Sequence, residues 1–219
     1  MLFRNREEAG EKLAEKLAEY KNKNTIVLAI PRGGVPVAKP IADKLNAELD
    51  LIIPRKLPIP WSPEVGFGAV THTGDVVLNQ DLVNEINLPE EDIRKIADMV
   101  LKEVRRRMEA YRGNRPLPTL KNKNVIIVDD GLATGYTMIA AIESVKKQHP
   151  KKVIAAAPVS PFDTEERIKQ YADEVVTLWA KPTYSFAVAS FYEDFHDMAD
   201  SEVTDILKNH KGGIKSDKN

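Results

Sequence analysis

The stretch that decides the fold is VIIVDDGLATGYT, residues 125–137. Its four β-branched aliphatic residues predict a buried strand, which runs directly into Asp129 and Asp130. Unpaired carboxylates are costly to bury, so we expect the two acids to lie at the end of the strand and to face a ligand. The residues after them are small or carry a hydroxyl, and we expect them to open a helix: Ala133, Thr134, Gly135, Tyr136 and Thr137.

The segments around this stretch alternate between strand and helix. Strands are predicted at 25–30, 49–54, 125–128, 153–157 and 174–179, and helices at 35–45, 135–147 and 162–171. This alternation predicts an α/β fold with a mostly parallel central sheet and helices on both faces. In such a sheet ligands bind beyond the carboxyl ends of the strands, which is where the two acids lie.

Composition limits the classes of function. The chain has 219 residues, of which 42% are hydrophobic and 30% charged, as in an ordinary globular protein with a real core. Its net charge of −1 argues against a general nucleic-acid or membrane binder. The absence of cysteine excludes disulfides, thiol catalysis and zinc-thiolate sites. The charged opening segment and the short apolar runs lead us to expect a cytoplasmic protein.

The acids and the loop together describe a site for a phosphorylated sugar. Carboxylates accept hydrogen bonds from hydroxyls, so Asp129 and Asp130 suit the diol of a ribose. A helix N-terminus with backbone N–H groups suits its 5-phosphate. The stretch is neither a P-loop nor a dinucleotide fingerprint, because it lacks both Gly-Lys-Ser/Thr and G-x-G-x-x-G. The alternative interpretation is a capped strand-loop-helix connection with exposed acids.

Residues 125–137 resemble the phosphoribosyl pyrophosphate (PRPP) signature of type I phosphoribosyltransferases, in its DD-x-x-A-T-G-x-T form. AIPRGGVPVA, RKLPIPWSPEVGFGAV and ADEVVTLWAKPTYSFAVASFYEDF are similar to a prokaryotic subgroup named "putative phosphoribosyltransferases". The resemblance implies a type I phosphoribosyltransferase-like single domain, 1–219, with its core at about 20–180. It also implies an inserted hairpin and long helix at 67–112, and a small hood subdomain of C-terminal aromatic residues at about 180–210.

The loop after the first strand is the second part of the implied site. The resemblance assigns Arg32, Gly33 and Gly34 to the pyrophosphate of PRPP. The residue types suit this role, because glycines let the backbone approach an anion and a guanidinium pairs with phosphate oxygens. The alternative is a plain strand-to-helix turn.

Residues 54–68 are predicted to be a long irregular stretch, because they carry four prolines, two glycines and a tryptophan. They resemble the mobile loop that closes over the substrates of the family. In that case Arg55 and Lys56 bring positive charge to the leaving pyrophosphate, and Glu64 is the single carboxylate of the loop. The alternative is a surface excursion with solvated charges, which we favour less because long loops in compact domains are usually functional.

The implied reaction is the transfer of a 5-phosphoribosyl group from PRPP to an acceptor, with release of pyrophosphate. Mg²⁺ is the implied cofactor, held mainly through PRPP and water and in part by Asp129 and Asp130. The family resemblance further implies a role in nucleotide metabolism and a homodimer, and the balanced charge leads us to expect no nucleic-acid or membrane partner. The main alternative function is a non-catalytic PRPP-binding regulator.

The acceptor is left open by the sequence. Ala133 stands where hypoxanthine-type members of the family carry an aspartate, so the chain is closer to adenine- or orotate-type members there, and Glu64 becomes the candidate proton donor. Six aromatic residues near the C-terminus could stack on an acceptor base, although we favour a role in packing. They are Trp179, Tyr184, Phe186, Phe191, Tyr192 and Phe195.

Overall fold

The protein is built around a five-stranded sheet in the order β2-β1-β6-β7-β8, in which every neighbouring pair is parallel. The structure is a computed structural model that describes residues 2–113, 115–182 and 186–210, and the side chains of all of these except 63 and 64. The strands are β1 (Thr25–Ala29), β2 (Glu48–Leu51), β6 (Asn124–Val128), β7 (Lys152–Pro161) and β8 (Glu174–Lys181). The predicted fold class is therefore confirmed.

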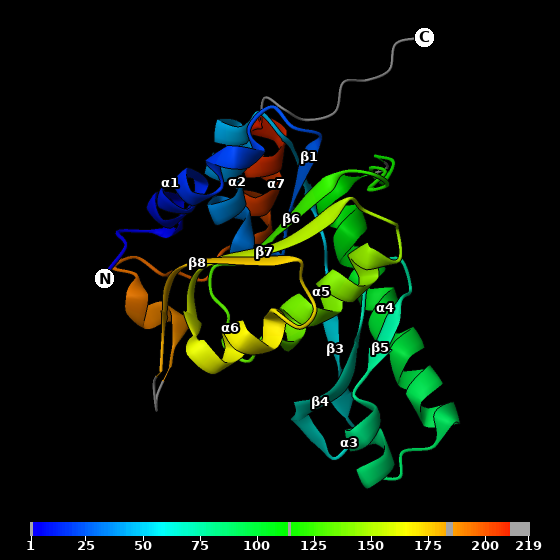
Figure 1. Cartoon of the computed structure of the whole chain (residues 1–219). Helices are drawn as coiled ribbons and strands as arrows, with labels where there is room; N and C mark the ends of the chain where they lie inside the picture. Colours follow the sequence, from blue (N-terminus) through cyan, green and yellow to red (C-terminus); the bar gives the residue numbers. More distant parts are fainter. Residues whose placement is uncertain (1, 114, 183–185, 211–219) are drawn as a thin grey trace.

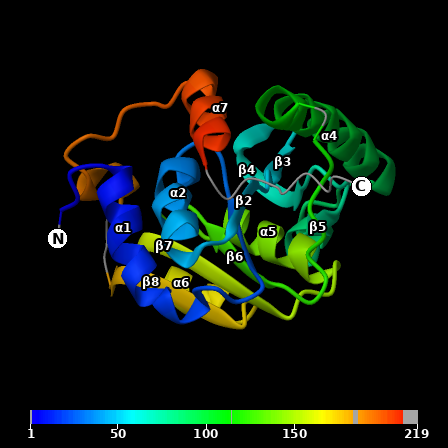
Figure 2. The same ribbon diagram turned by 90° about the horizontal axis from the view of Figure 1, so that it is seen from above.

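Helices cover both faces of this sheet (Figure 1). One face carries α1 (Arg6–Lys16) and α2 (Gly34–Leu45), and a short helix, η1 (Ala18–Tyr20), follows α1. The other face carries α5 (Tyr136–Lys146) and α6 (Phe162–Ile168). The last helix, α7 (Asp200–Asn209), packs on the outside of α2 and also touches α4 (Figure 2).

The central strand β6 explains why the apolar run at 125–128 is continuous rather than alternating. Ile126 and Val128 belong to the core under α1 and α2, whereas Val125 and Ile127 belong to the core under α5. All four side chains are fully buried. A parallel strand covered on both faces has no solvent side, so polar residues appear only beyond its end.

A second, smaller sheet extends from the carboxyl end of β2. It is antiparallel, in the order β3-β4-β5, and consists of β3 (Arg55–Ile59), β4 (Ser62–Val70) and β5 (Val76–Leu78). Two helices follow it, α3 (Gln80–Glu85) and α4 (Glu90–Arg112). The prediction of an irregular stretch at 54–68 is wrong, because β3 and β4 form a hairpin there. β4 also pairs with β5 in an antiparallel hairpin, whose turn contains Thr73, Gly74 and Asp75.

A buried ion pair anchors α4 to the main sheet. Arg112 donates from Nε and Nη2 to the two carboxylate oxygens of Asp50 on β2, both at 2.6 Å. The two side chains are only 4% and 6% exposed. Arg112 also donates to the backbone carbonyls of Arg115 and Pro116, so its guanidinium is well supplied with acceptors.

No helix in the described part of the chain is both long and apolar enough to cross a membrane.

Candidate functional site

The end of β6 places Asp129 and Asp130 side by side, partly buried, at the carboxyl edge of the sheet. The backbone N–H of Asp130 donates to Oδ1 of Asp129 at 2.9 Å. Burial raises the pKa of Asp129 well above its usual value, and the neighbouring charge of Asp130 raises it further. Burial also raises the pKa of Asp130, while a hydrogen bond from Arg6 opposes this rise. The pair is therefore electrostatically costly, as expected for groups kept to bind a ligand.

The loop after β1 lies directly against the two acids. A Cβ atom at Gly33 would come within 2.0 Å of Oδ2 of Asp130, and one at Gly34 within 2.6 Å of the carbonyl oxygen of Val128. Both positions therefore need glycine because of the close approach. The peptide bond between Pro31 and Arg32 is cis. The structure thus brings together two segments of the predicted site that lie almost a hundred residues apart in the sequence.

The predicted 5-phosphate segment forms a turn at 133–135 and continues into the first two residues of α5. Gly135 is the N-cap residue, with a φ of 79° that favours glycine. Thr164 on α6 donates to the carbonyl of Ala133 at 2.8 Å, and Arg167 donates to that of Thr134 at 2.9 Å. These two hydrogen bonds attach the turn to α6. The first N–H groups of α5 have no partner within the helix, as at any helix N-terminus. Thr134 and Thr137 are exposed.

Tyr136 stands where many members of the resembled family carry glycine, and the structure places its ring on the surface. The residue is 57% exposed, and the Arg167 guanidinium lies 5.4 Å from the ring centroid. Neither Thr164 nor Arg167 was among the predicted site residues. No local sequence signal marks Arg167, because it lies 33 residues from the turn that it contacts.

The N-terminal helix also reaches the acid pair, which no sequence pattern indicated. Arg6, the first residue of α1, donates from Nε to Oδ2 of Asp130 at 2.8 Å. Tyr192, in the segment before α7, donates its hydroxyl to the backbone carbonyl of Asp130 at 2.7 Å. Desolvation and the charge of Asp130 raise the pKa of Tyr192. The second acid is therefore held from both ends of the chain.

The predicted basic residues Arg32 and Arg55 pair with acids other than Asp129 and Asp130. Arg32 lies 3.5 Å from Asp200 at the start of α7, and its side chain is 45% exposed. Tyr111 on α4 donates to the same carboxylate at 2.7 Å. Arg55 lies 3.6 Å from Glu103, also on α4. Arg55 therefore pairs with α4 directly, whereas Arg32 pairs with α7, through an acid that is itself bonded to α4 eight residues, about 12 Å, beyond Glu103.

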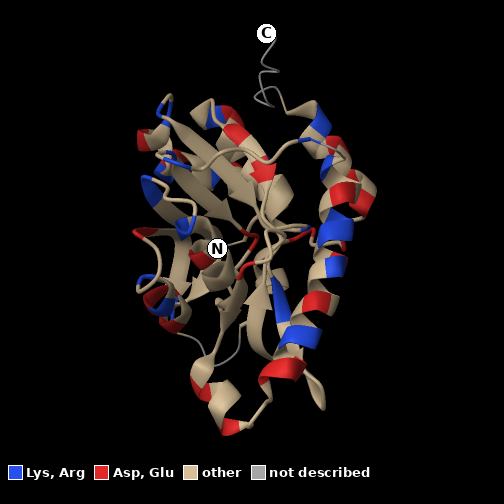
Figure 3. Cartoon of the chain, turned by 90° about the vertical axis from the view of Figure 1, so that its right-hand side faces the viewer, with Lys and Arg blue, Asp and Glu red and all other residues tan. Residues whose placement is uncertain are grey.

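Basic and acidic residues alternate along the long helix α4 (Figure 3). Arg106 and Arg107 both donate to Glu103, and their hydrogen bonds lower the pKa of that carboxyl to about 2. Lys56 lies on β3, next to Arg55, with an exposed side chain. Glu64 belongs to β4, but its side chain is outside the described residues, so its predicted role as proton donor stays a prediction.

The C-terminal aromatic residues pack mainly on one another. Trp179, Phe186 and Phe191 form one group, with ring centroids 4.7 to 6.2 Å apart. Tyr192 lies beside Phe195 at 5.1 Å. Tyr184 lies outside the described residues. These contacts favour the packing role over a base-stacking role, and the four rings other than Tyr192 are partly buried.

This segment also explains a residue in the signature. A Cβ atom at Gly131 would come within 2.5 Å of Val188 in η2 (Val188–Phe191). Glycine is required because η2 lies directly on the loop that follows the acids. The C-terminal segment therefore contacts the predicted site both at Gly131 and, through Tyr192, at Asp130.

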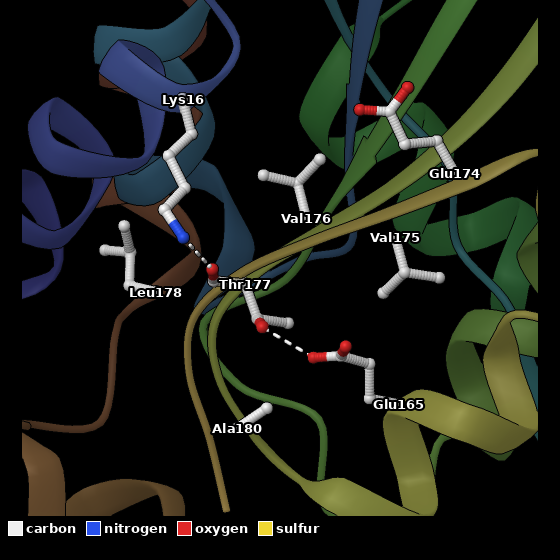
Figure 4. Close-up of a pocket in the computed structure, with 8 residues that line it drawn as sticks. All are labelled: Lys16, Glu165, Glu174, Val175, Val176, Thr177, Leu178 and Ala180. Atoms are coloured by element: carbon white, nitrogen blue, oxygen red, sulfur yellow. Dashed lines mark hydrogen bonds between the residues drawn. The ribbon is translucent and has the colours of Figure 1, made fainter.

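Two cavities lie away from these residues. One, of about 520 Å³, follows the outer edge of β8 between α1 and α6 (Figure 4). Within it Lys16 donates to the carbonyl of Thr177 at 2.8 Å, and the hydroxyl of Thr177 donates to Glu165 at 2.6 Å. The other, of about 290 Å³, is lined mostly by apolar atoms and includes His72, whose pKa burial lowers to about 4. The predicted site residues are in neither lining.

Comparison with known proteins gives a consistent result. The model of the phosphoribosyl transferase domain family matches residues 2–64 and 71–195. "Putative phosphoribosyl transferase Rv0571c" of Mycobacterium tuberculosis is 41% identical over 206 residues, which are 94% of this chain and 46% of that protein. The chain thus spans about half the length of the curated relatives it matches.

Two further similarities concern a shorter segment and the fold. A ribose-phosphate pyrophosphokinase of Pyrococcus furiosus is 41% identical over 66 residues, 29% of this chain and 24% of that protein. The crystal structure of TT1426 from Thermus thermophilus superposes with a TM-score of 0.83 at 38% identity, covering 96% of this chain and 99% of that one.

Proposed function

Because the chain belongs to the phosphoribosyl transferase domain family, we propose that it transfers the 5-phosphoribosyl group of PRPP to a nucleobase and releases pyrophosphate. One observation carries this proposal. The Asp130 carboxylate lies directly against Gly33 and the backbone of Asp129 against Gly34, in the loop that leads to the start of α5. Acceptors for a ribose diol, a glycine loop for pyrophosphate and a helix N-terminus for the 5-phosphate therefore share one edge of the sheet.

Each part of this edge has a role in holding PRPP. Asp129 and Asp130 accept hydrogen bonds from the ribose 2′ and 3′ hydroxyls. The backbone N–H groups from Ala133 to Thr137, with the Thr137 hydroxyl, bind the 5-phosphate. Gly33 and Gly34 let the backbone approach the pyrophosphate, and Arg32 pairs with its oxygens after it leaves Asp200.

The chemical step breaks the bond between the anomeric carbon and the pyrophosphate oxygen, and a nitrogen of the base forms the new bond. Positive charge develops on the ribose and negative charge on the leaving oxygen, as in glycoside cleavage. Arg55 and Lys56, on the hairpin β3–β4, are the residues that stabilise the departing pyrophosphate. Arg55 pairs with Glu103 on α4, so its guanidinium must leave that partner to act on the pyrophosphate.

The donor set suits Mg²⁺. This ion prefers oxygen ligands, keeps several waters and takes few ligands from the protein. Asp129 and Asp130 supply two carboxylates, and the described residues contain no group of three or more histidine or acidic side chains that would form a metal cage. Bound with PRPP, Mg²⁺ would neutralise charge on the leaving pyrophosphate.

The homodimer implied by the family resemblance stays a prediction.

The proposal is tested by a turnover screen of the full chain with PRPP, Mg²⁺ and a panel of purine and pyrimidine bases, with pyrophosphate release as the readout. We expect release that depends on both PRPP and one class of base. Tight PRPP binding without release for any base would refute the transferase and favour the non-catalytic regulator. Omission of Mg²⁺ in the same assay tests the cofactor.

A further inference from the structure

Arg6 is built into the candidate site although it lies 124 residues from the acid that it contacts. Its side chain is 9% exposed, and its guanidinium has three neighbours. Nε donates to Oδ2 of Asp130 at 2.8 Å, Nη1 donates to the backbone carbonyl of His196 at 3.0 Å, and the group lies 3.8 Å above the ring of Phe195. A planar guanidinium fixed at three points has little freedom to turn.

The same acid is restrained from two other directions. The backbone of Gly33 lies against the Asp130 carboxylate, because a Cβ atom at Gly33 would be only 2.0 Å from Oδ2. The Tyr192 hydroxyl holds the backbone carbonyl of Asp130 at 2.7 Å. Arg6 is the one charged group among these restraints and the one that bonds to the carboxylate itself. An aspartate beside a second aspartate would otherwise be pushed away by repulsion between like charges.

The contact leaves the carboxylate able to bind a ligand. The two oxygens of an ionised carboxylate offer about four acceptor positions, of which the Arg6 Nε–H uses one. We propose that Arg6 is a positioning residue of the PRPP site, which holds the Asp130 carboxylate in the orientation that accepts a ribose hydroxyl and offsets the charge of the acid pair. This inference rests on the proposed function and adds to it a residue from outside the signature.

A purely structural role of Arg6 and a positioning role predict different changes in ligand affinity. If Arg6 only fastened α1 to the C-terminal segment, its loss would lower thermal stability and affect all ligands alike. A positioning role confines the loss to ligands that carry the ribose, and spares inorganic pyrophosphate, which contacts the loop at Arg32. Ribose 5-phosphate and pyrophosphate therefore separate the two roles, since PRPP contains both.

The test compares Arg6→Met, Arg6→Lys and two controls by calorimetry with PRPP, ribose 5-phosphate and pyrophosphate, beside thermal unfolding. Arg4→Met removes an exposed arginine from the same segment. Phe195→Leu removes the ring under the guanidinium but keeps the bond to Asp130. We expect Arg6→Met to weaken PRPP and ribose 5-phosphate binding on the order of 10-fold or more, as for loss of a charged hydrogen bond. Pyrophosphate binding should stay within about twofold, and Arg6→Lys should recover part of the loss.

Several outcomes would overturn the inference. Unchanged ribose 5-phosphate binding in Arg6→Met, or an equal loss for pyrophosphate, would leave only a structural role. So would a Phe195→Leu variant that loses ribose affinity as strongly as Arg6→Met. If Arg6→Met does not fold, Arg6→Lys decides by the same ratio of ligand affinities. A wild-type protein that binds neither PRPP nor ribose 5-phosphate would refute the proposed function itself, and the role of Arg6 with it.

Discussion

The two ends of the candidate PRPP site differ in how deeply their side chains are buried and how closely they are paired. At the ribose end, Asp130 bonds to Arg6 at 2.8 Å between side chains that are 9% and 15% exposed, and the backbone of Gly33 closes over it. At the pyrophosphate end, Arg32 and Arg55 reach their partners at 3.5 and 3.6 Å, with side chains more than 40% exposed. The first region is buried and closely paired, and the second is exposed and more loosely paired.

This difference indicates how binding and chemistry are divided. Groups that must recognise the ground state of the substrate gain from being fixed in advance, because little entropy is lost on binding. Groups that act on the leaving pyrophosphate are needed only as charge develops, and an exposed hairpin can bring them in at that moment. We therefore expect substitutions at the acid pair to change affinity, and those on the hairpin to change rate.

The largest effect is expected from Asp129→Asn combined with Asp130→Asn. Each carboxylate loses charged hydrogen bonds of about 1.5–3 kcal/mol, so PRPP affinity should fall by roughly 3–6 kcal/mol in total. Calorimetry measures the loss, and thermal unfolding checks that the fold is retained. Asp163→Asn, at an exposed position on α6, is the matched control. Unchanged PRPP affinity in the double variant would contradict the ribose assignment.

Arg55→Ala combined with Lys56→Ala should act mainly on the rate. The expected loss in kcat is on the order of 10², comparable to the loss of one preorganised donor, while PRPP affinity changes far less. Single-turnover pyrophosphate release beside PRPP titration separates the two. Arg94→Ala with Lys95→Ala removes an equivalent exposed pair from α4. Equal losses in affinity and rate would mean that the hairpin only binds.

Thr137→Val examines the 5-phosphate segment. Its hydroxyl should contribute about 1 kcal/mol, so binding of ribose 5-phosphate and of PRPP should weaken alike, by about fivefold. Thr119→Val, at an exposed loop position, serves as the control. A loss seen with PRPP alone would place residue 137 at the pyrophosphate end instead.

The smallest effect is expected from Asp200→Asn, and it has the opposite sign. This carboxylate competes with pyrophosphate for Arg32, and an exposed ion pair contributes up to about 1 kcal/mol. Pyrophosphate should therefore bind a few-fold more tightly to the variant, with ribose 5-phosphate unaffected. Asp205→Asn, exposed on the same helix, is the control. Weaker pyrophosphate binding would show that Asp200 supports Arg32 rather than competes with it.

The ribose end could be predicted from sequence only in part. A run of apolar β-branched residues followed at once by two acids is a local signal, and it located β6 and its carboxyl edge correctly. The Arg6 contact has no such signal, because an arginine at the start of a helix is ordinary and its partner is 124 residues away. Gly33 could be assigned to an anion loop, but not to a contact with Asp130, since that depends on how β1 and β6 pair.

The hairpin β3–β4 was predicted as an irregular stretch for a physical reason. Prolines were weighed as strand breakers, yet Pro58 lies in β3 where the register with β4 shifts, and a short antiparallel sheet tolerates proline at such irregular positions. The helix α7 has no counterpart among the predicted elements. Its apolar residues Val203, Ile206 and Leu207 have helical spacing, but they span little more than one turn, too short a pattern to mark a helix by periodicity alone.

The lysine at the edge of the main sheet has a consequence for the behaviour of the protein at high concentration. β8 is an outer strand, and the unpaired backbone groups of such a strand are a template on which another chain can add. Lys16 places its ammonium group on the carbonyl of Thr177, so a strand arriving from a second molecule would have to displace a charge. We expect this single residue, which takes no part in the proposed chemistry, to protect the protein against edge-to-edge aggregation.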